Sequence, residues 1–268
     1  MRSKDFTLST YVALLTSLRR QQYTFQTVSE FAKNPAEKVV MLRHDVDIRK
    51  YNSLEFARIQ QSQGIVGTYY FRIVPESYNE NLIKEIHSMG HEIGYHYEDL
   101  DLAKGDPHKA IQLFTAHLAK LRKLVPVHSI CMHGSPRSSY DNREIWNHFR
   151  YQDFDIDVEP YFDIDYKKVF YLTDTGRRWN GFKFSVRDKV ENNFDLTFQS
   201  THEIIECLEA GKFPDKVLFN FHPQRWTNND LIWWQDTIVQ TFKNSVKYLL
   251  IKWRESKGAP LLSRHEMS

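Results

Sequence analysis

Residues 38–47 have the sequence KVVMLRHDVD, in which a run of apolar residues ends in two aspartates, Asp45 and Asp47. The run is short and rich in β-branched residues, so it favours a buried strand over a helix. Because side chains alternate along a strand, Asp45 and Asp47 are expected on one face and His44 on the other. Two carboxylates that close repel each other unless a proton or a cation lies between them, and a metal ion is the usual solution. The alternative is a turn in which an aspartate caps the helix near Asn52.

Short apolar runs that end in polar residues, each followed by a helical stretch, recur along the chain. Gly64 and Gly90 stand where a helix should end and a strand should begin. Strands alternating with helices in this way imply an α/β fold, a parallel sheet with crossover helices that is either open or closed into a barrel. The further strands are predicted at Ile65–Ile73, His91–Tyr95, His128–Met132 and Lys216–Phe221, and the helices at Asn52–Gln63, Asn79–Met89, Pro107–Leu124 and Arg143–Arg150.

The rest of the chain is assigned from periodicity and length. An amphipathic helix is expected at about residues 8–22 and a closing helix at about 229–255, which includes Lys243–Arg254. Residues 151–193 are aromatic and charged with weak periodicity, so short strands and long loops are expected there. Chains of this length routinely fold as one domain, so residues 1–268 are expected to form a single domain.

Composition excludes several classes of protein. Hydrophobic residues make up 41% and charged residues 26% of the 268 residues, which is ordinary for a globular protein. The 36 basic and 34 acidic residues leave a net charge of +2, too balanced to indicate nucleic-acid binding, and no apolar run approaches the roughly 18 residues of a membrane span. The amphipathic start does not resemble a signal peptide, and two cysteines cannot form a disulfide framework. A cytoplasmic location is therefore expected.

The polar residues that follow the predicted strands form the candidate site. In parallel α/β folds the carboxyl ends of the strands meet at one edge, and active sites are built there. Four of the predicted strands deliver an acidic or imidazole side chain to that edge, namely Asp45 and Asp47, His96, His133 and His222. One such residue alone would be a weak signal, whereas the four strands together indicate a functional site.

The histidines differ in what their positions predict. His91 and His96 are five residues apart, so a straight strand sends them to opposite faces, and His96, nearer the edge, is the expected metal ligand. His91 is expected to be a packing residue with a hydrogen bond. His133 precedes a glycine turn and could be a metal ligand, an orienting partner of Asp45 or a turn residue. His222 suits proton transfer, since an unperturbed imidazole has a pKa of about 6.5, and the alternative is a packed neutral ring.

Two arginine–tryptophan clusters are candidates for substrate binding. Arg177, Arg178 and Trp179 follow one another in residues 174–179, and Arg225 and Trp226 repeat the pattern after His222. Guanidinium groups beside an aromatic ring suit a phosphate or carboxylate next to a ring, as in a nucleotide sugar. A solvated loop of ion pairs would have the same composition.

Three local signatures resemble those of the polysaccharide deacetylases, the family with the NodB-like homology domain that is also classed as carbohydrate esterase family 4. Residues 42–47 (LRHDVD) resemble its first motif, residues 90–96 (GHEIGYH) its second, and residues 218–222 (LFNFH) its closing motif. The second signature is the most specific of the three. The likeness covers most of the chain, from about Val39 to His222.

The resemblance implies a fold and a set of roles. The fold would be a distorted (β/α) barrel of about seven strands. Asp45 would be the catalytic base and His222 the acid, and Asp47 and His96 would hold a divalent metal ion. Zn²⁺ is favoured by a nitrogen-rich ligand set, although a carboxylate also admits other divalent ions.

The sequence departs from the family pattern at two places. The second metal histidine of the family falls at Leu100, and HGSP at 133–136 stands where the third motif has an arginine before its proline. We expect His133 to replace the missing ligand, with Glu98 and His91 as weaker candidates.

These features together predict a metal-dependent hydrolase that removes an N-acetyl group from an amino sugar. The expected substrate is a nucleotide- or lipid-linked precursor of a surface glycan, met in the cytoplasm. Leu100 motivates an alternative, a sugar-binding protein that keeps the barrel but has lost catalysis. Arg177 and Arg178 motivate another, a metal hydrolase acting on a phosphate ester.

Overall fold

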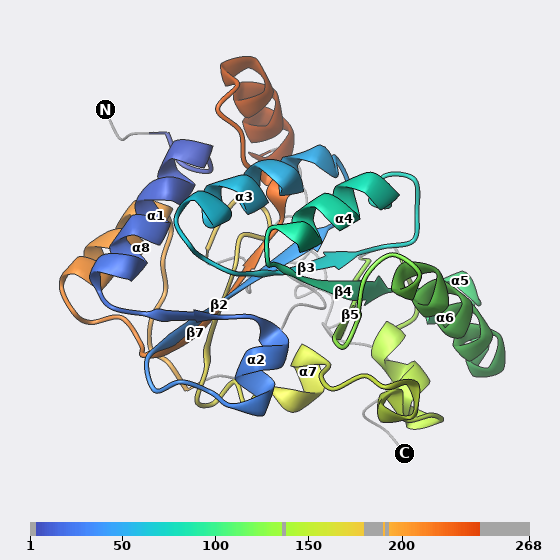
Figure 1. Ribbon diagram of the computed structural model, residues 1–268. Coiled ribbons are helices and arrows are strands. Elements are labelled where there is room, and N and C mark those ends of the chain that lie inside the picture. The colour runs from blue at the N-terminus through green and yellow to red at the C-terminus, as the bar shows by residue number, and fades with distance from the viewer. Residues whose placement is uncertain (1–3, 136–137, 180–189, 191–192, 242–268) are drawn as a thin grey trace, which may run out of the picture.

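The structure, a computed structural model, describes residues 4–135, 138–179, 190 and 193–241. Within these residues every pair of neighbouring strands is parallel, and the strands follow the order β5-β4-β3-β2-β7-β6, with β1 added at the edge of β2 (Figure 1). The strands are β1 Thr24–Gln26, β2 Val39–Val46, β3 Thr68–Phe71, β4 Glu92–Tyr97, β5 Ile130–Met132, β6 Phe170–Thr173 and β7 Lys216–Phe221. The expected seven-stranded α/β architecture is confirmed, as a half-barrel whose described strands run in an open path from β5 to β6.

Strand β2 is the centre of the sheet. All eight of its residues are buried. Its first half pairs with β1 and its second half with β3 on the same edge, while β7 pairs along the other edge. The carboxyl end of β2 therefore lies between the ends of β3 and β7, which places Asp45 in the middle of the edge where the strands end.

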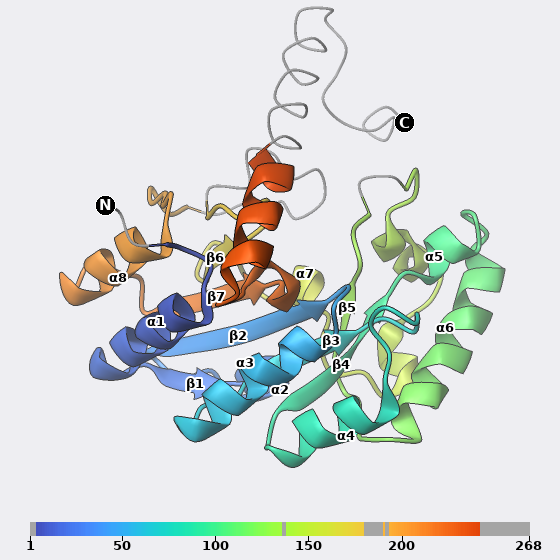
Figure 2. The same cartoon turned by 90° about the horizontal axis from the view of Figure 1, so that it is seen from above.

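Helices cover the sheet on both faces. The α-helices are α1 Leu8–Arg20, α2 Val28–Lys33, α3 Tyr51–Ser62, α4 Glu80–Ser88, α5 Asp99–Leu102, α6 Pro107–Arg122, α7 Pro160–Asp163 and α8 Thr201–Glu209, and the 3-10 helices include η1 Asn142–Asn147, η2 Tyr151–Phe154 and η4 Pro223–Arg225. Figure 2 shows α1, α3 and α4 side by side along one face of the sheet. A further helix begins at residue 230 and is described to residue 241. Within the described residues, no helix has the length and apolar character needed to cross a membrane.

The alternation of side chains in β2 separates two apolar cores. Val40 and Leu42 belong to the larger core under α1, α3, α4 and α6, whereas Val39 and Met41 belong to the smaller core that α2 and the residues after α7 complete. The same alternation turns His44 toward the larger core, where its ring stacks on Tyr69 with centroids 4.1 Å apart. Asp45 therefore faces the smaller core, and the expected division of His44 from the aspartates is confirmed.

Several boundaries differ from the expectations. The helical segment expected at Arg143–Arg150 is a shorter 3-10 helix, η1, which ends at Asn147. Within it the Trp146 and Phe114 rings meet edge to face, with centroids 5.0 Å apart. The short elements β1, α2 and α8 were not predicted, while β6 is one of the short strands expected in residues 151–193. Residues 180–189 and 191–192, and the expected helix beyond 241, lie outside the described residues. Gly64 and Gly90 have φ of +66° and +91°, as expected for glycines just past a helix end.

Candidate active site

The ends of β2, β4, β5 and β7 bring three imidazoles to one carboxylate. Asp47 Oδ1 lies 3.5 Å from His96 Nε2 and 3.7 Å from His133 Nε2. Asp47 Oδ2 lies 3.9 Å from His222 Nε2. The side chains that sequence reasoning placed at this edge are therefore together in space, with two histidines on one oxygen of Asp47 and the third on the other.

The two rings beside Asp47 Oδ1 are each fixed through the opposite nitrogen. His96 Nδ1 lies 2.9 Å from the carbonyl oxygen of Cys131, and His133 Nδ1 lies 2.8 Å from Glu98 Oε2. A carbonyl and a carboxylate only accept hydrogen bonds, so both Nδ1 atoms carry the proton and donate it. In the neutral form of each ring the lone pair at Nε2 then faces Asp47, which is the arrangement by which metal-binding histidines are oriented in proteins.

Asp47 itself gives a test of whether these residues suit a metal ion. Among the described residues its Oδ1 atom is buried and accepts no hydrogen bond. A carboxylate oxygen and imidazole lone pairs 3.5–3.7 Å apart repel one another unless a cation lies between them. Two ligands at about 2.1 Å from one tetrahedral ion are about 3.4 Å apart, close to these spacings. The donor set therefore fits a divalent cation.

In the described part of the chain no three His, Cys, Asp or Glu side chains form a preformed ion cluster. Burial opposes the charge of Asp47, but the neighbouring histidines in their protonated form, His96 first, hold the pKa of this carboxyl well below its usual range. Asp47 is therefore a carboxylate at neutral pH, ready to bind a cation.

The weaker candidates for the missing ligand are occupied elsewhere. Both oxygens of Glu98 accept hydrogen bonds from Arg72 at 2.7–3.0 Å. Burial opposes ionisation of Glu98, but His133 and Arg72 lower its pKa to about 2. His91 lies on the other face of the sheet, where its Nε2 is 3.0 Å from the Ala57 carbonyl oxygen. Of the three candidates, only His133 faces Asp47.

Asp45 is held by a residue that the sequence reasoning missed. Arg43 donates from Nε to Asp45 Oδ1 at 2.8 Å and from Nη2 to Oδ2 at 2.7 Å, and both side chains are buried. Burial raises the pKa of the Asp45 carboxyl, but the Arg43 guanidinium outweighs it, and the pKa falls to about 2. Asp45 Oδ2 also lies 3.9 Å from His96 Nε2, so one imidazole nitrogen is within 4 Å of both aspartates. The one signal in the sequence was spacing, because residues two apart on a strand, such as Arg43 and Asp45, lie on the same face.

His222 is held by a second carboxylate that received no role from the sequence. Its Nδ1 lies 2.6 Å from Asp174 Oδ1, and its backbone N–H donates to Asp174 Oδ2 at 2.9 Å. The Trp226 indole N–H also donates to Asp174 Oδ2, at 2.7 Å. Burial and Arg225 lower the pKa of His222, but the Asp174 carboxylate outweighs them and the pKa is raised. His222 Nε2 is thus directed at Asp47 Oδ2.

A cleft of about 610 Å³ opens beside Asp47. Its lining includes Arg177, Arg225 and Gln224, and on the far side residues of the helix that begins at 230. Arg177 Nη1 donates to the Trp233 carbonyl oxygen at 3.1 Å, whereas its buried Nη2 has no partner among the described residues. Arg225 Nη1 donates to the Asp174 carbonyl oxygen at 2.9 Å. Two cationic side chains therefore border the cleft next to the imidazole cluster.

The remaining predicted binding residues lie elsewhere. Trp179 and Trp226 were expected to face substrate, and this is wrong: both rings are buried in the core, where Trp179 Nε1 donates to Thr201 Oγ1. Each of these large rings buries apolar surface in the core that it would leave in water at a position facing the cleft. Arg178 is exposed and lines a smaller hollow of about 190 Å³ next to the cleft.

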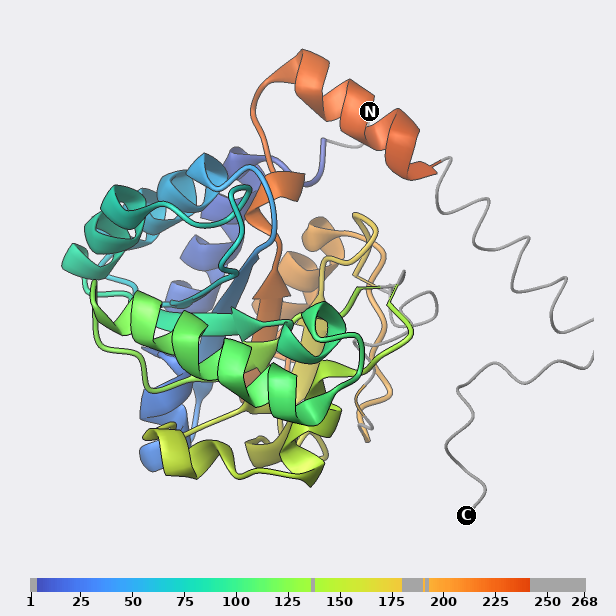
Figure 3. The ribbon, with the colours of Figure 1, turned by 90° about the vertical axis from the view of Figure 1, so that its right-hand side faces the viewer.

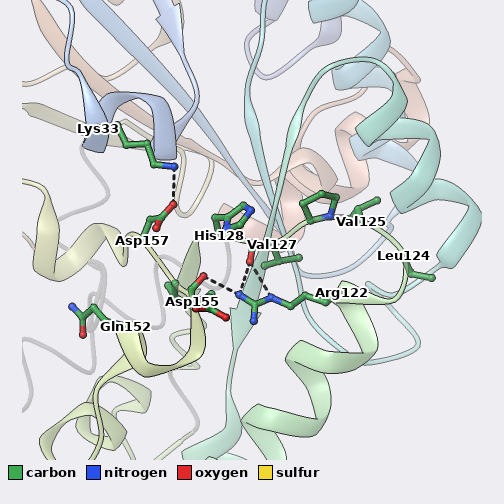
Figure 4. A pocket seen from close by; sticks show the side chains of 11 residues that line it. Lys33, Arg122, Leu124, Val125, Val127, His128, Gln152, Asp155 and Asp157 are labelled. Atoms are coloured by element: carbon green, nitrogen blue, oxygen red, sulfur yellow. Dashed lines mark hydrogen bonds and ion pairs between the residues drawn. The ribbon is translucent and has the colours of Figure 1, made fainter.

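A larger hollow, of about 1100 Å³, lies at the opposite end of the sheet, before the start of β5 (Figure 4). Three of the charged side chains that line it already have partners: Lys33 pairs with Asp157 at 2.8 Å, and Arg122 donates to the carbonyl oxygens of Val127 and Asp155. None of the candidate site residues lines it. Its size therefore does not make it the active site, and the smaller cleft at the imidazole cluster is the candidate.

No protein-family model and no curated protein matches the sequence. Among solved structures, the chain is similar to a CE4 family pseudoenzyme from Bacillus anthracis (14% identity, TM-score 0.41, covering 79% of this chain and 63% of that one). It is also similar to PdaA, a family 4 carbohydrate esterase of Bacillus subtilis (12%, TM-score 0.42, 86% and 83%). A third is the Xyl-CE4 domain of a multidomain xylanase from the hindgut metagenome of Trinervitermes trinervoides (14%, TM-score 0.39, 87% and 97%).

These structures are members of the family that the three sequence motifs resemble. The chain spans less than two thirds of the length of the first of them, the pseudoenzyme. Identities of 12–14% and TM-scores near 0.4 are too low to transfer the role of a residue from one chain to another. The roles of the site residues therefore rest on the distances, burial and charges within this chain.

Proposed function

We propose that this chain is a divergent polysaccharide deacetylase, a metal-dependent hydrolase that removes an N-acetyl group from an amino sugar. The observation that carries the proposal is the environment of Asp47 Oδ1. This oxygen is buried, accepts no hydrogen bond from the described residues, and is faced by the Nε2 atoms of His96 and His133. Two imidazoles and one carboxylate are a ligand set that suits Zn²⁺, and also other divalent ions that accept nitrogen and oxygen ligands.

The residues around this ligand set can each take one role in amide hydrolysis. A dication held by Asp47, His96 and His133 would supply Lewis acidity toward the acetyl carbonyl and make a water molecule a better nucleophile. Asp45, kept ionised by Arg43, accepts the proton of the attacking water, since each of its oxygens can accept a hydrogen bond beyond the one from Arg43.

A second proton transfer, to the leaving amine, is also needed. As the C–N bond breaks, the amine nitrogen takes a proton from His222 Nε2, and the products are acetate and the free amino sugar. Asp174 fixes the His222 ring by accepting from Nδ1, and the raised pKa of His222 favours the protonated form that an acid catalyst needs. Base and acid thus both lie close to the cluster, since Asp45 Oδ2 is 3.9 Å from His96 Nε2 and His222 Nε2 is 3.9 Å from Asp47 Oδ2.

The side chains that line the cleft also indicate a class of substrate. Arg177 and Arg225 border it beside Asp47, and guanidinium groups bind phosphates and carboxylates through paired hydrogen bonds. We infer a substrate that carries an anionic group near the N-acetyl sugar, as in a nucleotide- or lipid-linked glycan precursor. A cytoplasmic encounter with such a precursor is part of this proposal.

The test combines metal content with product release. The purified chain, loaded with Zn²⁺, should bind about one ion and release acetate from N-acetylated amino sugars. His133→Gln should lower metal affinity at least 10-fold and acetate release in proportion. His91→Gln is the matched control, a buried histidine outside the site, and should keep both. Release of phosphate from model esters without release of acetate would contradict the proposal.

A second candidate is a sugar-binding protein on the same half-barrel that no longer catalyses. It is favoured by the lack of a preformed ion cluster among the described residues and by Leu100, buried on α5, at the position of the family's second histidine. Glycan binding by calorimetry, with neither bound metal nor acetate release, would establish this candidate and exclude the enzyme.

A further inference from the structure

Arg72 lies between two of the strand ends that carry the candidate metal ligands. It directly follows β3, whose neighbours in the sheet are β2 and β4. Its Nη1 atom donates to the carbonyl oxygen of Asp47, the residue after β2, at 3.4 Å. Its Nε and Nη2 atoms donate to Glu98 at 2.7–3.0 Å, where the chain passes from β4 into α5 on the side of the domain that Figure 3 faces. One guanidinium group therefore links the ends of β2 and β4.

Glu98 is a competitor of His133 for the place of the third metal ligand. It stands two residues after His96, and both side chains contact His133: the two imidazole centroids are 5.2 Å apart, and Glu98 Oε2 lies 2.8 Å from His133 Nδ1. An ionised carboxylate attracts a dication more strongly than a neutral imidazole does. Asp47, His96 and Glu98 would therefore also form a ligand set, with two carboxylates and one imidazole.

The hydrogen bonds of Glu98 oppose this second ligand set. Oε1 accepts from Nε and Nη2 of Arg72, and Oε2 accepts from Nη2 of Arg72 and from His133 Nδ1. The Arg72 and Glu98 side chains are 18% and 8% exposed, so the guanidinium balances a largely buried negative charge. Turning Glu98 toward an ion would break this forked pair and leave Arg72 without its carboxylate, close to a dication.

We propose that Arg72 determines which side chain completes the metal site. By holding Glu98 through the forked pair, it keeps this carboxylate as the hydrogen-bond partner of His133 Nδ1 and makes His133 the third ligand. Arg72 is thus a positioning residue, which acts on the ion through Glu98 and His133. An arginine suits the task, because its planar fork matches a carboxylate and stays charged. This role rests on the proposed function for the presence of a metal ion, but not for the reaction catalysed there.

Loss of Arg72 would release Glu98 to take the place of His133. The ligand set would change from two imidazoles and one carboxylate to one imidazole and two carboxylates. Carboxylates suit Mn²⁺ better than imidazoles do, so the preference of the site for Zn²⁺ over Mn²⁺ would decrease.

The experiment is a set of metal titrations of the full chain by calorimetry, and it needs no enzymatic activity. In the wild type, His133→Gln should weaken Zn²⁺ binding about 10-fold or more. In an Arg72→Met background the same substitution should weaken it less than about 3-fold, because Glu98 then supplies the ligand. Comparing the cost of His133→Gln in the two backgrounds cancels the direct effect of the lost arginine charge on the ion. The ratio of Zn²⁺ to Mn²⁺ affinity should also be lower in Arg72→Met than in the wild type.

Three further backgrounds control for charge and folding. Arg72→Met with Glu98→Gln removes both charges of the pair, and because a neutral amide is a poor ligand, His133→Gln should again cost about 10-fold or more. Arg143→Met breaks a forked pair with Asp141 outside the site and should keep the wild-type cost. Arg72→Lys keeps the charge without the fork, so it serves if Arg72→Met does not fold, and it should lower the cost of His133→Gln below that in the wild type.

Other outcomes overturn the proposal. Equal costs of His133→Gln in the wild type and in the folded Arg72 variant would do so, while the metal site of the proposed function would stand. An unchanged ratio of Zn²⁺ to Mn²⁺ affinity, or a small cost of His133→Gln when Glu98→Gln is also present, would exclude Glu98 as the replacing ligand. A wild type that binds no Zn²⁺ would contradict the proposed function as well.

Discussion

The buried ion pair beneath the site offers the most quantitative prediction. Arg43→Met removes the guanidinium and keeps a side chain of similar length, so Asp45 is left ionised without a partner. The two side chains are 0% and 4% exposed, and the arginine binds both carboxylate oxygens.

The magnitude follows from this burial. Breaking a buried pair by removing one partner destabilises a protein by about 3–5 kcal/mol, because an uncompensated charge remains in the interior. Total stabilities are about 5–15 kcal/mol, so Arg43→Met should lose a third or more of the free energy of unfolding. Adding Asp45→Asn removes the unpaired charge and should recover part of that loss.

The assay is urea unfolding followed by fluorescence, with a control that the chain itself provides. Arg143 pairs with Asp141 through the same two-residue spacing and the same forked geometry, but these side chains are 30% and 22% exposed. Arg143→Met should therefore cost about 1 kcal/mol or less. Equal losses for Arg43→Met and Arg143→Met, or a loss below about 1 kcal/mol for Arg43→Met, would refute the reasoning.

Three further predictions use independent parts of the molecule. Asp174→Asn would present an amide to His222 Nδ1 and should lower kcat by about 10²–10⁴-fold while metal content stays unchanged; unchanged kcat would contradict the assigned role. Burial raises the pKa of Glu159 from 4.5 to about 7, so its contribution to stability is full below pH 4.5 and is lost as the pH rises through 7, about 3 kcal/mol in all. In urea titrations at a series of pH values, Glu159→Gln should weaken the pH dependence of the free energy of unfolding. The same pH dependence in the variant and the wild type would contradict this prediction. A Cβ at Gly94 would lie 2.3 Å from the Tyr70 ring, so Gly94→Ala should lower the free energy of unfolding by about 1–3 kcal/mol, and an unchanged urea midpoint would exclude that contact.

The features that follow from local periodicity were predictable from the sequence. Alternation along β2 separates His44 from the two aspartates, and the odd spacing of His91 and His96 sends the two rings to opposite faces of the sheet. The parallel topology then brings the strand ends to one edge. These inferences need only the period of a strand and the direction of its neighbours.

The partners of the site residues could not be derived in the same way. Arg43 is two residues from Asp45, and whether its fork meets that carboxylate depends on a rotamer that burial selects. Asp174 is 48 residues from His222, and the two meet through the pairing of β6 with β7. The burial of Trp179 and Trp226 could not be predicted either. An arginine–tryptophan pair has the same sequence whether it lies at a binding surface or at the edge of a core.

The central claim is that Asp47, His96 and His133 hold one divalent cation. An anomalous-difference map from a crystal soaked in Zn²⁺ tests this most directly, because it locates the ion without reference to activity. We predict a single strong peak within about 2.3 Å of Asp47, His96 Nε2 and His133 Nε2. A map with no peak at these three side chains, or with its strongest peak elsewhere in the protein, would contradict the claim.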